Sequence, residues 1–358
     1  MKKIAILTIN DNDNYGNRLQ NYAVQECLKK FNNLVETISN IKGRYGKKII
    51  IYKIKDIVKK LPFINKKYTR YNNFMKFNKN INCSKYHIDE NHMHDDLGEK
   101  YDCFFSGSDQ VWNPNFNRLS DIDFLTFASK NKRNSFSASF GIDEIPDKLK
   151  EYYKNNLLQM NNISVREDRA KEMIVELTGR NDVEVLVDPT MLLDAEEWDK
   201  VSKKPEQIKE GEKYILNYFL GELSDSRKSE IERIAKENNC RIINIMDKKD
   251  PFYVSGPSEF LYLEKNAFLI CTDSFHSSVF AILYNRPFII FDREQEGLKS
   301  MNSRIDTLIE KFDLKNRRFS GSITEENLNH DYTEAYKILE KEREKSLNFL
   351  KKALDIKE

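Results

Sequence analysis

A histidine and several hydroxyl groups follow an apolar segment in the second half of the chain. Residues 267–272 read AFLICT, and Ser274, His276, Ser277 and Ser278 come directly after them. This order predicts a buried strand that runs into a helix whose first turn carries the polar side chains. A helix N-terminus has free N–H groups that can hold a phosphate, and a histidine there can act as a general acid. The alternative is that His276 and Ser274 only cap the helix.

Two arginines stand at the predicted starts of other helices. Arg166 follows residues 162–165, which we predict to be a strand, and Arg18 follows the turn 14–17, whose last residue is Asn17. A guanidinium group is a planar fork that suits a carboxylate or a phosphate. Both arginines and Asn17 are therefore candidates for binding an anionic substrate. The alternative for Arg166 is an ion pair with a nearby acid.

The segment FFSGSDQVWNP, residues 104–114, places polar groups after another predicted strand. Gly107 permits a tight turn, and Ser108, Asp109 and Gln110 follow it. Trp112 offers an aromatic face on which a sugar ring could stack. We expect these residues to lie near the site. The alternative is a packed loop with Trp112 in the core.

Other reactive side chains carry less specific signals. The stretch 87–96, HIDENHMHDD, is rich in metal-ligand types but reads as a loop, and a metal site needs ligands on rigid elements. The chain has no phosphate-binding G-x-x-x-x-G-K motif, no G-x-S-x-G motif and no G-x-G-x-x-G motif at its first turn. We therefore expect neither a metal nor a cofactor.

The elements that must position these groups alternate between strands and helices, which is typical of a parallel α/β fold. Residues 3–10 predict a strand, 18–30 a helix, and 122–128 and 134–141 two further strands. The second half repeats the pattern and closes with an amphipathic helix over about 333–354. We predict two Rossmann-like lobes that face a central cleft, over residues 1–190 and 191–358, with the last helix packing back on the first lobe.

The bulk composition excludes several classes of protein. The chain has 358 residues, 39% of them hydrophobic, and a formal net charge of only +2, so it has no global field that favours nucleic acid. Its five cysteines are odd in number and form no C-x-x-C pair, which argues against a disulfide framework. No segment reaches the roughly 18 apolar residues of a membrane span, and the N-terminus does not resemble a signal peptide. We expect a soluble cytoplasmic protein.

Residues 42–86 form a basic segment with 14 Lys and Arg and a single acid, Asp56. One interpretation is an amphipathic helix that contacts an anionic membrane surface or an anionic acceptor. The other is a solvated, lysine-rich helical insertion in the first lobe.

Taken together in order, the motifs resemble the polysaccharide pyruvyl transferase family. The segments that carry the resemblance are NYGNRLQNYAVQ, FFSGSDQVWNP, SFSASFG, SVRE, VLVDPTMLL, TDSFHSSVFAI, NRPFIIF and NSRIDTL, between about residues 3 and 313. The resemblance implies a glycosyltransferase-B-like fold, with the acceptor on the first lobe and the donor on the second. It also implies transfer of a pyruvyl group from phosphoenolpyruvate to a sugar, which forms a ketal and releases phosphate.

The resemblance also implies roles for individual residues. The catalytic histidine falls on His276 and the donor-binding arginine on Arg166, while Asp109 is a candidate base toward the acceptor hydroxyl. Family members often carry an arginine two residues before the histidine, where this chain has Ser274. Arg18 and Arg304 are candidates for the missing cation.

By the same resemblance, the protein acts in bacterial exopolysaccharide or cell-wall synthesis at the inner face of the membrane, with a glycan or lipid-linked saccharide as acceptor. Two other functions stay open. One is a nucleotide-sugar-dependent glycosyltransferase of the same architecture, and the other is a non-catalytic glycan-binding relative.

Overall fold

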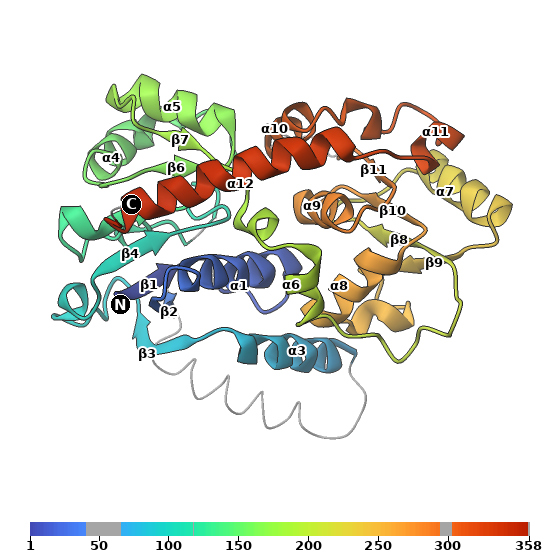
Figure 1. The fold of residues 1–358 in the computed structure, drawn as a ribbon, viewed down its shortest axis with the longest axis horizontal. Coiled ribbons are helices and arrows are strands. Elements are labelled where there is room, and N and C mark those ends of the chain that lie inside the picture. The colour runs from blue at the N-terminus through green and yellow to red at the C-terminus, as the bar shows by residue number, and fades with distance from the viewer. Residues whose placement is uncertain (41–65, 117, 294–302, 357–358) are drawn as a thin grey trace. The chain divides into compact units, whose positions relative to one another are not determined.

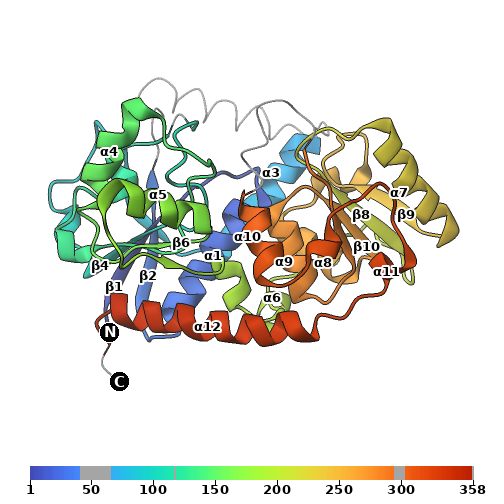
Figure 2. The same ribbon diagram turned by 90° about the horizontal axis from the view of Figure 1, so that it is seen from above.

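The computed structural model describes residues 1–40, 66–116, 118–293 and 303–356, and they form two compact α/β units (Figures 1 and 2). The N-terminal unit comprises residues 1–68, 78–192 and 342–358, and the C-terminal unit comprises 69–77 and 193–341. The boundary at 192/193 lies two residues from the one that the sequence predicted. We describe each unit by itself.

The N-terminal unit is built on a parallel sheet with the strand order β3-β2-β1-β4-β5. Its strands are β1 (Lys3–Leu7), β2 (Leu34–Asn40), β3 (Cys83–Ile88), β4 (Cys103–Ser106) and β5 (Arg133–Ser135). The chain leaves β1 toward one side of the sheet and returns to its other side with β4. The carboxyl ends of β1 and β4 are thus a switch point, where ligands of open α/β sheets gather.

The helices of this unit follow the strands as the sequence predicted. They are α1 (Tyr15–Lys29), α4 (Asp147–Leu157) and α5 (Asp168–Thr178). A two-stranded parallel sheet is formed by β6 (Ser164–Val165), which precedes α5, and β7 (Glu184–Val185), which follows it. Residues Ile4, Ala5 and Ile6 of β1 have no exposed surface. An uninterrupted apolar run of this kind is typical of a parallel strand covered on both faces.

The C-terminal unit repeats the plan with a parallel sheet in the order β11-β10-β8-β9. Its strands are β8 (Tyr214–Tyr218), β9 (Arg241–Asn244), β10 (Leu269–Thr272) and β11 (Phe288–Ile290). Its helices are α6 (Ala195–Asp199), α7 (Asp225–Glu237), α8 (Pro257–Asn266), α9 (Phe275–Leu283), α10 (Ser303–Lys311) and α11 (Glu325–Leu328). Here the switch point lies between the carboxyl ends of β8 and β10.

Two helices are divided between the units. α12 (Thr333–Ala353) belongs to the C-terminal unit up to Lys341 and to the N-terminal unit from Glu342 onward. In the first part the Tyr336 hydroxyl donates to the Ile282 carbonyl, at 2.8 Å. In the second part Lys345 donates to the Val185 carbonyl, also at 2.8 Å, and Phe349 stacks on Phe136. The last helix therefore returns to the N-terminal unit.

α3 (Lys66–Phe77) is the first described part of the basic segment, whose residues 42–65 lie outside the described residues. Arg70 is buried and donates to the carbonyls of Tyr253 and Ser255, at 3.1 and 3.3 Å. Gly256 allows this close approach, because a Cβ there would lie 2.7 Å from the Asn73 backbone. This part of the segment is a packed component of the C-terminal unit, so for α3 the prediction of a wholly solvated insertion in the first lobe is wrong.

One predicted strand is wrong. Residues 122–128 begin in a 3-10 turn, Asp121–Phe124, and Leu125 follows in the left-handed region at φ 60°. The Asp123 carboxylate accepts from the Ser120 N–H and from Arg118, at 3.1 and 2.6 Å. These local hydrogen bonds stabilise the turn in place of a strand ladder.

Candidate functional site

His276 lies at the carboxyl edge of the C-terminal sheet, as the sequence predicted. β10 ends at Thr272, Ser274 is the N-cap, and α9 begins at Phe275, so His276 is in the first helical turn. All residues of α9 are buried, and His276 itself is 7% exposed. Its ring packs edge-on against Phe275, with the centroids 5.3 Å apart. The imidazole is thus held on a rigid helix end at the switch point of its sheet.

Asp273, between β10 and α9, joins the loops at this edge. Its carboxylate accepts from the N–H groups of Leu220 and Gly221, both at 2.8 Å, and pairs with Arg293 Nε at 2.9 Å. Leu220 and Gly221 follow β8, and Arg293 follows β11. One carboxylate therefore fixes the segments after three strands of the sheet and holds a guanidinium there. Sequence reasoning did not single out Arg293, although its place just after the apolar run PFIIF, residues 287–291, was a signal.

The serines around His276 have structural roles. Ser277 and Ser278 have no exposed surface, and their hydroxyls donate to Glu264 at 2.6 Å and to the Ser274 carbonyl at 3.1 Å. The Ser274 N–H donates to Thr272 Oγ1 at 3.0 Å. The expectation that Ser277 and Ser278 bind substrate is wrong, because both hydroxyls are used inside the protein. The Ser274 side chain makes no capping hydrogen bond.

Glu264 of α8 accepts a hydrogen bond from the helical turn that carries His276. The side chain is fully buried and accepts from Ser277, and within the described residues its second oxygen has no hydrogen-bond partner. Burial raises the pKa of Glu264 well above its ordinary value, and the hydrogen bond from Ser277 offsets this only in part. The hydrogen bond from Ser277 to Glu264 ties α9 to α8, and the raised pKa of Glu264 favours its protonated form.

In the N-terminal unit, Arg166 is the centre of a buried ionic network. It pairs with Asp188 at 2.6 Å, with Asp109 at 3.0 Å and with Glu167 at 4.0 Å. Burial alone lowers the pKa of Arg166, but the three carboxylates more than offset this effect and raise it. The sequence left open a substrate-binding arginine or an ion pair, and the structure shows the ion pair.

Asp109 and Asn17 belong to the same network. Asp109 accepts from Arg166, from the Gln110 N–H at 2.9 Å and from the Asn17 amide. A carboxylate with three donors, one of them a guanidinium, is a poor acceptor for a substrate proton. The geometry thus gives Asp109 and Asn17 a positioning role and does not support Asp109 as a base.

The remaining residues of segment 104–114 are packed inside the unit. Ser108 donates to the Ser137 carbonyl and to Asp188, at 2.9 and 3.0 Å, and Gln110 accepts from Asn113 at 2.6 Å. Trp112 has no exposed surface and stacks on Phe124. The prediction of a stacking platform is wrong, because Trp112 is part of the core. Gly107, at φ 109°, has no room for a Cβ, which would lie 2.7 Å from the Phe136 carbonyl oxygen.

Arg18 differs from Arg166. It is 4% exposed, and its guanidinium donates to the Ile9 carbonyl at 2.9 Å and to the Asn10 side chain at 3.0 Å. Within the described residues it forms no ion pair, and its Nε has no hydrogen-bond partner. Burial lowers the pKa of Arg18 to about 10, while Cys83 and Asp11 act weakly in the opposite direction. A buried cation with no carboxylate partner at a helix N-terminus is suited to bind an anion.

Arg304, the other candidate cation, lies in the first turn of α10 in the C-terminal unit and is 8% exposed. Its place in the same unit as His276 is compatible with the predicted role, which stays a prediction.

Comparison with known proteins identifies the family of this chain. The model of the polysaccharide pyruvyl transferase family matches residues 14–295, which include both His276 and Arg166. The chain belongs to the polysaccharide pyruvyl transferase family. The match runs from the start of α1 to beyond the end of β11 and includes every strand of the two large sheets except β1.

Solved structures with the same fold are also found. The UDP-GlcNAc 2-epimerase from Neisseria meningitidis, bound to UDP-GlcNAc, has a TM-score of 0.51 at 12% identity, with 99% of each chain covered. The epimerase from Methanocaldococcus jannaschii has a TM-score of 0.50 at 14% identity, with 94% of this chain and 92% of that chain covered. Among curated proteins no match is found. This pyruvyl transferase family member thus has the two-unit α/β fold of the glycosyltransferase-B class.

Family membership indicates a transferase. In the part of the chain that the structure describes, no helix combines the length and apolar character that crossing a membrane requires.

Proposed function

We propose that this protein transfers a pyruvyl group from phosphoenolpyruvate to a sugar of a bacterial surface glycan, forming a ketal with release of phosphate. The observation that carries the proposal is the family match over residues 14–295, together with His276 on the first turn of α9 inside the matched range.

The chemistry needs one group that gives a proton to carbon. His276, as imidazolium, protonates the methylene carbon of phosphoenolpyruvate, which becomes the methyl group. A sugar hydroxyl then attacks the neighbouring carbon, phosphate leaves, and a second hydroxyl closes the ketal. The two hydroxyls lose two protons in all. One of them re-protonates His276, and the other leaves with phosphate. Support comes from the position of His276 in the first turn of α9, which the hydrogen bond from Ser277 to Glu264 ties to α8.

The anionic groups of the substrates need a cation whose charge is not already neutralised. Arg166 faces three carboxylates, and Arg293 is paired with Asp273. Arg18 forms no ion pair within the described residues, so in the N-terminal unit we assign the binding of an anionic substrate group to Arg18. Arg166 in this proposal is a positioning residue, which shapes the carboxyl edge of β4 through Asp109.

The acceptor in this proposal is a glycan or a lipid-linked saccharide, and the protein acts in the cytoplasm at the inner face of the membrane. Exopolysaccharide or cell-wall synthesis is the process to which such a product belongs. No cofactor is part of the scheme.

The test is a phosphate-release assay with phosphoenolpyruvate and a panel of lipid-linked bacterial glycans. We expect release only when both substrates are present. A thermal-shift series with phosphoenolpyruvate, UDP, GDP and CMP accompanies it, and stabilisation by phosphoenolpyruvate alone supports the proposal. Stabilisation by a nucleotide with no release of phosphate would show a nucleotide-sugar-dependent transferase instead. Glycan binding without turnover of either donor class would show a non-catalytic relative.

A further inference from the structure

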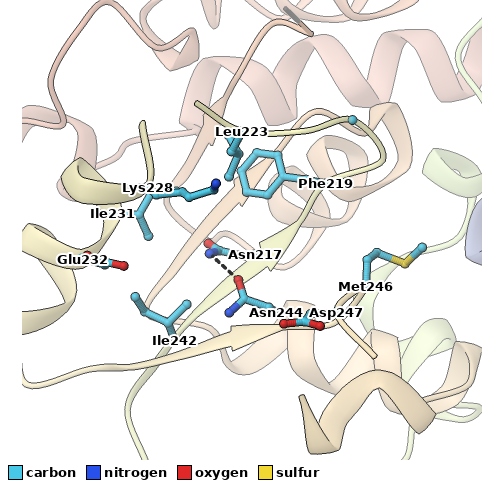
Figure 3. Close-up of a pocket in the computed structure, with 11 residues that line it drawn as sticks. Asn217, Phe219, Leu223, Lys228, Ile231, Glu232, Ile242, Asn244, Met246 and Asp247 are labelled. Atoms are coloured by element: carbon cyan, nitrogen blue, oxygen red, sulfur yellow. Dashed lines mark hydrogen bonds between the residues drawn. The ribbon is translucent and has the colours of Figure 1, made fainter. Parts of the chain in front are cut away.

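A cavity of about 370 Å³ lies in the C-terminal unit, and its described lining includes neither His276 nor Arg18. Its walls come from the carboxyl ends of β8 and β9, the loop that follows each strand, and the face of α7 toward them (Figure 3). The volume falls within the range of about 300–1,000 Å³ that is usual for small-molecule sites. The cavity is large enough to hold one sugar ring.

The first observation that points to a ligand is an unsatisfied buried amide. Asn217 of β8 is 7% exposed and lines the cavity. Its Nδ2 donates to Asn244 Oδ1 at 2.9 Å, drawn as the dashed line in Figure 3. Its Oδ1 has no hydrogen-bond partner within the described residues. Leaving a buried acceptor unpaired destabilises the protein, and a ligand that donates a hydrogen bond would remove this penalty.

The second observation is the type of polar group around Asn217. Glu232 of α7 lines the cavity and, within the described residues, makes neither a hydrogen bond nor an ion pair. Asp247, after β9, uses Oδ1 to accept from the Lys249 N–H at 2.9 Å. The available groups are therefore mainly acceptors, which favour a ligand with several O–H donors.

The third observation is the balance of charge and apolar surface. Lys228 is the single cation of the lining, against the carboxylates of Glu232 and Asp247, and it already pairs with Asp225 at 3.2 Å. This balance disfavours a phosphorylated ligand. The apolar part of the lining consists of Phe219, Leu223, Ile231, Ile242 and Met246. Such walls suit the C–H face of a sugar ring.

We propose that this cavity binds an uncharged pyranose ring, with its hydroxyls donating to Asn217, Glu232 and Asp247 and its C–H face on the apolar walls. The ring is either a free monosaccharide or one unit of a larger glycan, and both share this chemistry. The inference goes beyond pyruvyl transfer and does not depend on it, because sugar binding in this cavity needs no donor substrate.

The test is direct binding without phosphoenolpyruvate. Methyl glycosides of glucose, galactose, mannose and N-acetylglucosamine form one arm, and lactose and chitobiose form the other. Binding is detected by saturation-transfer-difference NMR and quantified by isothermal titration calorimetry. We expect at least one arm to bind: binding of the first indicates a monosaccharide site, and binding of the second alone indicates a unit of a larger glycan.

Three variants make the test specific. The double variant Glu232→Gln, Asp247→Asn changes two exposed side chains and should weaken binding by about tenfold or more, since each lost hydrogen bond is worth about 1 kcal/mol. Asn217→Leu should abolish binding; if this buried change unfolds the unit, the double variant alone decides. Glu222→Gln is the control, since Glu222 is exposed in the loop after β8 but does not line the cavity. The proposal is overturned if neither arm binds, if all variants bind equally, or if UDP binds and is lost in the double variant while the sugars do not bind.

Discussion

The carboxyl edges of the two sheets use the same topology in opposite ways. In the N-terminal unit, polar groups after β4 and β6 are paired with one another around Arg166. Asp109 and Asp188 form ion pairs with its guanidinium and neutralise its charge. In the C-terminal unit, Asp273 orders the loops, while Asn217 and Glu232 face a cavity with acceptors that the described protein does not fill. At the N-terminal edge the guanidinium charge is matched by carboxylates of the protein, whereas the C-terminal edge leaves an amide oxygen and a carboxylate available to a ligand.

The largest expected effect is a loss of turnover when His276, the proposed proton donor, is replaced. His276→Asn removes the proton donor, and the loss of a general acid lowers turnover by about 10²–10⁴-fold. The melting temperature should stay close to that of the wild type, because the change is nearly isosteric at a helix end. Phosphate release measures the first effect and differential scanning fluorimetry the second. His330→Asn, at a partly exposed histidine of the same unit, is the control. Near-normal turnover of the His276 variant would refute its role.

The next largest effect is expected from breaking the buried ionic network around Arg166. Arg166→Met leaves Asp109, Asp188 and Glu167 without their cation, and removing one partner of a buried pair costs about 3–5 kcal/mol. Urea unfolding should show this loss of stability. Arg169→Met, at a partly exposed arginine of α5 that pairs with Glu172 and Glu176, should change stability by less than about 1 kcal/mol. If the Arg166 variant kept its stability and lost only substrate binding, Arg166 would be a ligand-binding residue after all.

Glu264 gives a pH-dependent prediction of intermediate size. Its folded-state pKa is raised by burial, so the wild type loses stability as pH rises above the unfolded-state pKa of about 4.3. Glu264→Gln removes this loss and should be more stable than the wild type at pH 8, by about 1–3 kcal/mol, but not at pH 4. Urea unfolding at the two pH values measures the difference. An equal difference in unfolding free energy at the two pH values would contradict a raised folded-state pKa of Glu264.

Arg18 gives the smallest expected change in stability, and it can be compared with Arg166 in the same unit. Because burial lowers its pKa, its charge opposes folding, and Arg18→Met should raise the stability of the ligand-free protein by roughly 1 kcal/mol. The same variant should lose the thermal shift caused by phosphoenolpyruvate. Arg133→Met, at an arginine whose guanidinium donates to the carbonyls of Ala128 and Thr126, should keep that shift. A shift that survives in the Arg18 variant would move the anion site elsewhere.

The features that the sequence predicted are local ones. The apolar run before His276 and the polar turn after it specify a buried strand and a helix start within about a dozen residues, and the structure places β10 and α9 there. The first strand and helix were predictable for the same reason. Residues 122–128 were not, because the turn depends on hydrogen bonds of Asp123 that an apolar pattern does not reveal.

The features that the sequence missed depend on residues far apart in the chain. Arg166 meets Asp109 and Asp188, which are 57 and 22 residues away, so no local pattern could distinguish an ion pair from a free guanidinium. Trp112 has the composition of a sugar platform, but its neighbour Phe124 makes it part of the core. The cavity around Asn217 brings together three segments with no shared motif.

Pyruvyl transfer by His276 can be tested by following the donor carbon into the product. The protein is incubated with phosphoenolpyruvate labelled with ¹³C at its second carbon and with the lipid-linked glycans of a bacterial surface-polysaccharide pathway, and the glycans are examined by NMR and mass spectrometry. The account predicts a labelled ketal carbon in the glycan with the wild type and His330→Asn, and almost none with His276→Asn. Label that never enters a glycan, or that enters equally with the His276 variant, would contradict it.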